Sequence, residues 1–246
     1  METVVKYIIG ISIFLLAGCK KDQFEIWPAK KIQLPKEVRI NAIHVSPDGT
    51  VRAGGGIRGK EAWLFTSHDA GQDWNAQFIS NRSSLYCIDF INDTLGWLGG
   101  DTLHLWRTTD GSNWNFFWLS DQVPTHESDR PAVRQISHRG ANQLCFAAGD
   151  LYYHGASFTS DDSGENWHFA VADNAVYQAS FYGSKPQTFG YGTAMHYVND
   201  QWQTLRAPAD HLVSVLPLDD QTAIAASVLG HIYRLNTTGV TEEKIA

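Results

Sequence analysis

The chain has 246 residues, of which 43% are hydrophobic and 18% charged, with 21 Gly and 9 Trp but only 2 Met. This length suits one domain or one repeat fold, and the surplus of aromatic and turn-forming residues over helix-favouring side chains predicts an all-β class. A coiled coil, a collagen and a disordered chain are excluded. The net charge of −7, without a long basic run, leads us to expect no nucleic-acid partner.

The N-terminus predicts export. Lys6 precedes the apolar run 7–16, which is short for a permanent membrane span and ends at small residues, so residues 1–18 are predicted to be a signal peptide. The alternative is an uncleaved N-terminal anchor. The segment Leu16-Ala17-Gly18-Cys19 resembles the lipobox of bacterial lipoproteins, which implies that Cys19 is lipidated and becomes the first mature residue. We expect membrane contact through this lipid only, in the cell envelope, with the periplasmic and surface-exposed sides of the outer membrane left open.

Residues 19–39 are predicted to be a tether. Within it, Phe24–Pro28 and Lys31–Leu34 have strand-like composition and are candidates for an edge strand that closes a ring. Residues 40–246 are predicted to be the folded domain.

A repeat organises this domain. Ser67–Trp74 and Ser160–Trp167 both read S-x-D-x-G-x-x-W, Thr108–Trp114 is one residue shorter, and Asn199–Trp202 keeps only an acidic turn and the Trp. The four Trp residues are separated by 40, 53 and 35 positions. That spacing is typical of one four-stranded propeller blade.

The residue types of the repeat suit a tight turn between strands. The Asp carboxylate accepts backbone N–H groups, the hydroxyl does so more weakly, Gly supplies a positive φ, and the Trp ring packs below the turn. We therefore expect structural roles for Ser67, Asp69, Gly71 and Trp74, for Thr108, Asp110, Gly111 and Trp114, and for Ser160, Asp162, Gly164 and Trp167.

These turns resemble the Asp-box, or bacterial neuraminidase repeat, of sialidases and sortilins. The segment Phe90–Gly100, followed by Trp106–Gly111, resembles more closely the photosystem II assembly-factor propellers, whose blades pair a G-W-x-x-G strand with a T-x-D-G turn. The resemblance implies a β-propeller, here of about five blades. We expect the blades at Ile40–Ile79, Leu85–Leu119, Val133–Val171, Val176–Arg206 and Leu212–Ile245.

Candidate binding residues gather at one predicted end of the blades. Five arginines occur in the connections between blades, and the segment Gly54–Lys60 is read as a loop whose glycines admit a close ligand. The candidates are Arg39, Arg58, Arg82, Arg130, Arg134 and Arg206, with Tyr152, Tyr153 and His154 as added stacking surface. A positive patch of this kind suits a carboxylate, an acidic glycan or an acidic peptide. The alternative is ordinary loop charge paired with acidic neighbours.

The expected function is non-catalytic binding of a protein partner or an acidic glycan by a monomer that needs no cofactor or metal. The alternative is a degenerate sialidase-like glycosidase, but Val38-Arg39-Ile40-Asn41 departs from the sialidase F/Y-R-I-P motif on both sides of the Arg, and no catalytic residue is assigned. Cys87 and Cys145 fall in different blades, so we expect two free, buried thiols, with a disulfide between them as the alternative.

Overall fold

The computed structural model describes residues 31–119, 131–150, 153–205, 207, 209–236 and 243–244. The chain divides into two units at Ile32/Gln33, and every described strand belongs to the second unit. The described part contains no helix long and apolar enough to cross a membrane. The predicted signal peptide, Cys19 and Phe24–Pro28 lie outside the described residues.

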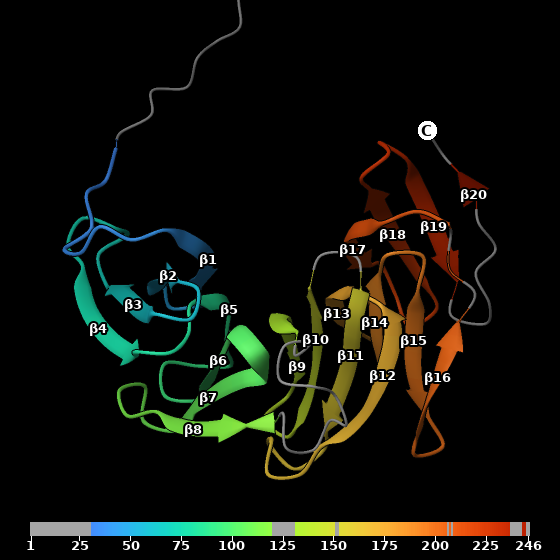
Figure 1. Ribbon diagram of the computed structural model, residues 1–246, viewed down its shortest axis with the longest axis horizontal. Helices are drawn as coiled ribbons and strands as arrows, with labels where there is room; N and C mark the ends of the chain where they lie inside the picture. The colour runs from blue at the N-terminus through green and yellow to red at the C-terminus, as the bar shows by residue number, and fades with distance from the viewer. Residues whose placement is uncertain are drawn as a thin grey trace, which may run out of the picture. The chain divides into compact units, whose positions relative to one another are not determined.

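Twenty described strands form five antiparallel four-stranded sheets, each made of consecutive strands (Figure 1). The first sheet contains β1 (Ile40–Val45), β2 (Val51–Ile57), β3 (Glu61–Ser67) and β4 (Asn75–Ser80). The second contains β5 (Leu85–Phe90), β6 (Gly96–Gly100), β7 (His104–Thr108) and β8 (Asn115–Trp118), with the 3₁₀ turn η1 (Asp101–Leu103) after β6. The third contains β9 (Ala132–Arg139), β10 (Gln143–Asp150), β11 (Tyr153–Ser160) and β12 (His168–Asn174).

The fourth sheet contains β13 (Val176–Tyr182), β14 (Lys185–Gly190), β15 (Ala194–Val198) and β16 (Gln201–Leu205). The fifth contains β17 (Leu212–Pro217), β18 (Thr222–Ser227), β19 (Ile232–Asn236) and β20 (Glu243–Lys244). The predicted all-β propeller of about five four-stranded blades is confirmed, and the blades begin and end within a few residues of the predicted bounds.

The apolar core is divided between the blades. One cluster of buried side chains lies between each pair of neighbouring sheets, and Phe65, Phe146 and Phe158 are among the largest buried residues. The first strands of consecutive sheets also pack against one another in the order β1, β5, β9, β13, β17. The first strand of each blade is therefore the inner one, as expected of a propeller.

The turns formed by the Ser/Thr-x-Asp repeat, for which we keep the name Asp-box turns, have closely similar hydrogen bonds in the first three blades. In the third, Ser160 Oγ donates to Asp162 Oδ1 at 2.8 Å, and the same oxygen accepts the backbone N–H groups of Glu165 and Asn166 at 3.1 and 2.9 Å. Gly164 N donates to Ser160 Oγ at 2.8 Å, with φ at +86°. The sets Ser67/Asp69/Gly71 and Thr108/Asp110/Gly111 repeat this pattern.

The indole N–H groups of the Asp-box tryptophans differ in their partners. Trp74 Nε1 donates to the Gly71 carbonyl at 3.0 Å, and Trp114 Nε1 donates to Gln77 Oε1 at 3.2 Å. The fourth copy is a plain hairpin turn in which Asn199 and Asp200 both have positive φ. That turn type suits Asn and Asp, so this blade keeps its connection without the Asp-box bonds.

Two details of the sequence interpretation are wrong. Gly54, Gly55 and Gly56 lie within β2 and not in a loop. Glycine is needed at two of these positions, because a Cβ on Gly55 would overlap the Arg39 carbonyl and one on Gly56 would overlap the Glu61 carbonyl. These glycines allow close strand approach, and the loop is only Arg58-Gly59-Lys60. Lys31–Leu34 forms no strand, and β20 supplies the fourth strand of the fifth blade.

Candidate functional site

Each blade has a β-bulge at the same place in its first strand. The register with the second strand skips one residue, and the skipped residues are Asn41, Tyr86, Arg134, Tyr177 and Val213. A bulge residue has no partner in the neighbouring strand, and its side chain departs from the regular alternation between the two faces of the sheet. Because the first strand begins where the second strand ends, these residues meet the loops after β2, β6, β10, β14 and β18.

Charged side chains of the first three blades come together at this end of the inner strands: Arg58 follows β2, Asp101 follows β6, and Asp150 ends β10 beside the Arg134 bulge. Asp150 Oδ2 lies 2.7 Å from Arg58 Nη2, and Asp150 Oδ1 lies 3.3 Å from Arg134 Nη2. Arg134 Nε also donates to the Gly149 carbonyl at 2.7 Å. Asp101 Oδ1 lies 3.6 Å from Arg58 Nε, which makes an ion pair too long for a hydrogen bond. We call Arg58, Tyr86, Asp101, Arg134, Asp150 and Tyr177 the rim cluster.

Backbone contacts hold the acidic side of the rim cluster. Asp101 is buried, and its Oδ2 accepts N–H groups from Gly59 at 3.1 Å and Ser84 at 2.8 Å. The hydrogen bond to Asp150 raises the pKa of Arg58. Burial, followed by the charge of Asp101, raises the pKa of Tyr86. Arg58 is therefore charged and the Tyr86 phenol is neutral, and Asp101 and Asp150 lie where they balance much of the positive charge.

Aromatic rings extend the rim cluster toward the fifth blade. The guanidinium of Arg134 lies 4.9 Å from the Tyr86 ring centroid and 5.6 Å from that of Tyr177. The Tyr177 ring lies 4.8 Å from His211, and Tyr191 lies 5.8 Å from His211. Burial lowers the pKa of His211 below its ordinary value, so the imidazole is neutral at pH 7.

A hollow of about 530 Å³ adjoins Tyr177. We call it the rim pocket, and its lining residues are Tyr177, Tyr191, Ala209, Asp210, His211, Val228 and Leu229. Asp210 holds one wall, since it accepts the His211 N–H at 2.7 Å and lies 3.1 Å from both His231 Nδ1 and Tyr233 Oη. Val228 and Leu229 are exposed, so the rim pocket offers an apolar surface beside a charged one. Such a combination suits an organic ligand that has both an apolar part and a charged part.

The predicted binding residues are distributed over several places. Arg58 and Arg134 come together, whereas Arg82 lines a separate groove with Phe78 and Trp118. Arg39 is exposed and its carbonyl accepts the Gly56 N–H. Tyr153 pairs with Asp150 across the β10–β11 hairpin and is 63% exposed, and His154 follows it with φ at +58°. Arg130, Arg206 and Tyr152 lie outside the described residues.

Sequence reasoning missed Tyr86, Asp101, Asp150, Tyr177, Tyr191 and His211. The signal for Tyr86 and Tyr177 was present, because each is the second residue of a predicted blade. Within the described ranges, no group of three His, Cys, Asp or Glu side chains is placed to hold a metal ion.

Residues 19–239 match the family model described as photosynthesis system II assembly factor YCF48. The chain belongs to this family. Its expected resemblance to the photosystem II assembly-factor propellers is thereby confirmed.

Curated relatives are distant. The chain is 22% identical over 167 residues to "Photosystem II assembly protein Ycf48" of Synechococcus sp. (strain JA-2-3B'a(2-13)), covering 67% of this chain and 46% of that protein. It is 25% identical over 173 residues to "Photosystem II assembly lipoprotein Ycf48" of Synechococcus sp. (strain CC9902), covering 68% and 47%. The chain thus spans about half the length of the curated relatives it matches.

Among solved structures, "YCF48 bound to D1 peptide" is similar with a TM-score of 0.57 and 19% identity, over 82% of this chain and 67% of that one. At this identity the likeness shows the fold alone.

Proposed function

We propose that this protein is a non-catalytic assembly module that binds an extended segment of a partner polypeptide across the rim cluster and the rim pocket. The observation that supports the proposal is the convergence of one bulge residue from each blade on the same end of the inner strands. Residues on a rigid scaffold that present both charge and aromatic surface suit peptide recognition.

The chemistry of the rim cluster favours a peptide with one acidic and one apolar group. Arg58 is 57% exposed at its side chain, so a carboxylate of the partner reaches its guanidinium in exchange for one bond to Asp150. Arg134 stays anchored by the Gly149 carbonyl and offers its face between two tyrosines. An apolar side chain of the same segment then fills the rim pocket beside Val228 and Leu229.

Family membership supports a protein partner over a glycan. A similar structure is named for a bound D1 peptide, and the curated relatives are named as assembly proteins. An acidic glycan suits the rim cluster less well, because Asp101 and Asp150 face the two arginines and would repel a polyanion.

Site-specific photo-crosslinking in host cells tests this proposal. A benzophenone amino acid at Tyr177 or Tyr191 is expected to give discrete polypeptide adducts, and Arg134→Ala in the same chain is expected to reduce them by about tenfold. The matched control places the same amino acid at Asn113, in the Asp-box turn of the second blade. Equal adducts from Asn113, or none from the rim positions, would contradict the proposal.

We also propose that Cys19 carries a lipid that holds the protein in the cell envelope. The support is the Leu16-Ala17-Gly18-Cys19 segment together with a relative that is named a lipoprotein. Several acyl chains give stable attachment, since each buried CH₂ contributes about 0.8 kcal/mol. An alkyne-tagged palmitate is expected to label the wild-type protein and not Cys19→Ser, whereas Cys87→Ser is expected to label normally.

A further inference from the structure

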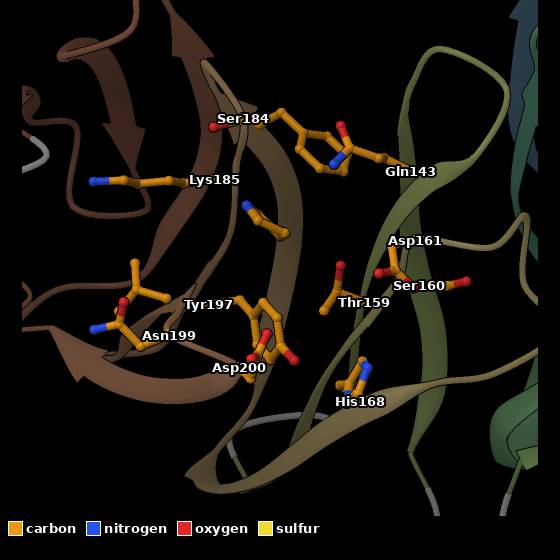
Figure 2. A pocket seen from close by; sticks show the side chains of 13 residues that line it. Gln143, Thr159, Ser160, Asp161, His168, Ser184, Lys185, Tyr197, Asn199 and Asp200 are labelled. Atoms are coloured by element: carbon orange, nitrogen blue, oxygen red, sulfur yellow. The ribbon is translucent and has the colours of Figure 1, made fainter.

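A second groove lies between the third and fourth blades, at the end of the strands that carries the Asp-box turns. One hollow of about 330 Å³ receives side chains from both blades (Figure 2). A neighbouring hollow of about 420 Å³ shares His168, Tyr197 and Asp200 with it. We call the two together the blade 3–4 groove.

Three aromatic rings lie where the two hollows of this groove meet, and they contact one another. The Tyr197 ring lies 5.4 Å from the His168 ring and 5.6 Å from the Trp202 ring. Trp202 Nε1 donates to the His168 carbonyl at 3.1 Å, which ties the fourth blade to the third. The faces of electron-rich rings attract cations, most strongly where water is partly excluded.

Two carboxylates flank the rings without being neutralised. Asp161 stands beside Asp162 in the Asp-box turn, but Asp162 makes the turn bonds and Asp161 has no hydrogen bond or ion pair to any described residue. Asp200 likewise has none in the described ranges. Lys185 lines the hollow, yet its amino group points away from the Asp161 side (Figure 2).

The hydroxyl of Tyr197 is the third oxygen of this arrangement. It is buried and has no hydrogen-bond partner among the described residues, which is uncommon for a buried polar atom. Burial, followed by the charges of Asp200 and Asp161, raises the pKa of Tyr197. Both carboxylates therefore act on the same point, where a positive guest with N–H donors would be stabilised and an anion repelled.

We infer that the blade 3–4 groove binds a lysine or arginine side chain of a partner polypeptide. The aliphatic stem of that side chain lies along Tyr197 and Trp202, and its charged end lies between Asp161 and Asp200, beside the Tyr197 ring. This site uses none of the rim residues, so it holds or fails independently of the proposed function.

Fluorescence anisotropy with the mature protein in detergent tests the inference. The probe is a fluorescein-labelled glycine-serine peptide with two adjacent lysines, compared at low ionic strength with the same peptide carrying norleucines. We expect only the lysine peptide to bind. Asp161→Asn combined with Asp200→Asn is expected to weaken it by about tenfold or more, and Tyr197→Phe by about threefold.

Matched variants separate this site from general attraction to an acidic protein. Glu37→Gln with Asp73→Asn removes the same charge from exposed positions elsewhere and is expected to leave affinity unchanged. Far-ultraviolet circular dichroism checks that each variant folds; Asn tolerates the positive φ at position 200.

Three results would overturn the inference. In the first, the Glu37/Asp73 control weakens binding of the lysine peptide as much as the Asp161/Asp200 variant does. In the second, the lysine peptide does not bind the wild-type protein. In the third, the lysine peptide does not bind but calorimetry detects binding of maltohexaose, which Tyr197→Phe removes. The last result would assign the groove to a neutral sugar.

Discussion

His138 Nδ1 lies 2.7 Å from Asp89 Oδ2, joining the inner strand of the third blade to that of the second. The hydrogen bond to Asp89 raises the pKa of His138, whereas burial lowers the pKa of the neighbouring His44. Arg52 also stands close, with its guanidinium 3.8 Å from the Phe90 ring. The contact with Asp89 therefore favours the protonated form of His138, and burial favours the neutral form of His44.

This pair predicts a pH-dependent contribution to stability. Because the folded pKa of His138 is raised, its stabilisation is fully present below its ordinary pKa of about 6.5 and is lost as pH rises through the folded value. His138→Gln is expected to cost more in free energy of unfolding at pH 5.5 than at pH 8.5. Urea denaturation at both values measures the difference, and both proteins carry His44→Gln because the charge of His138 also acts on the pKa of His44. A cost that grows with pH would contradict the assignment.

The Asp-box turn of the third blade predicts an acid-sensitive element. Hydrogen bonds, led by that from the Asn166 N–H, lower the pKa of Asp162 to about 2. A lowered carboxyl pKa gives stability that is present above about pH 4 and lost as pH falls toward 2. Asp162→Ala is expected to cost about 1–2 kcal/mol at pH 6, as loss of a comparable cap does, and much less at pH 2.5.

Asp73→Ala is the control for that experiment, since the Asp73 carboxylate makes no hydrogen bond in the described part of its turn. Its effect is expected to stay within about 0.5 kcal/mol at either pH. Equal losses for the two variants would show that the turn bonds contribute nothing.

The close approach of β1 and β2 predicts a sharp cost for one methyl group. Gly55→Ala forces its Cβ into the Arg39 carbonyl, and overpacking of this kind costs about 1–3 kcal/mol or more. Gly140→Ala is the matched control: its φ is +64° but nothing lies within 4 Å of the new Cβ, so about 1 kcal/mol of backbone strain is expected. Thermal unfolding of both variants measures the difference.

The two internal thiols predict chemical inertness in the native state. Cys87 and Cys145 are free and buried in the interfaces between blades, and burial raises the pKa of both well above that of an exposed thiol. Iodoacetamide at pH 8 is expected to modify neither until denaturant is added, after which both react. Rapid labelling without denaturant would show that the interfaces open.

The fold was predictable because its signal is local and repeated. Each Ser-x-Asp-x-Gly-x-x-Trp copy specifies its own turn through side chains within a few residues, so Ser160 and Asp162 identify a blade without knowledge of its neighbours. The candidate site was harder, since its partners are distant in sequence: Arg58 and Asp150 are 92 positions apart. An excess of arginine near the blade connections grouped Arg58 with Arg134, which do share a carboxylate, but it did not identify that carboxylate as Asp150.

The glycine error has a related cause. A run of glycines reads as a loop when only the chain itself is considered, whereas Gly55 is required by the carbonyl of a neighbouring strand. Steric demands of that kind are visible only once two segments are placed side by side.

The bulges in the inner strands have a consequence for how such a protein can change. Each skipped residue lies between paired positions, so its replacement leaves the inter-strand hydrogen bonds of its blade in register. Side chains at Tyr86, Arg134, Tyr177 and Val213 can therefore be exchanged while every sheet stays in register, whereas Asn41 ties the first blade to the second through Ser84 Oγ and the Leu85 carbonyl. Sequence divergence within the family is therefore expected to concentrate at these four bulge positions before it reaches the strands around them.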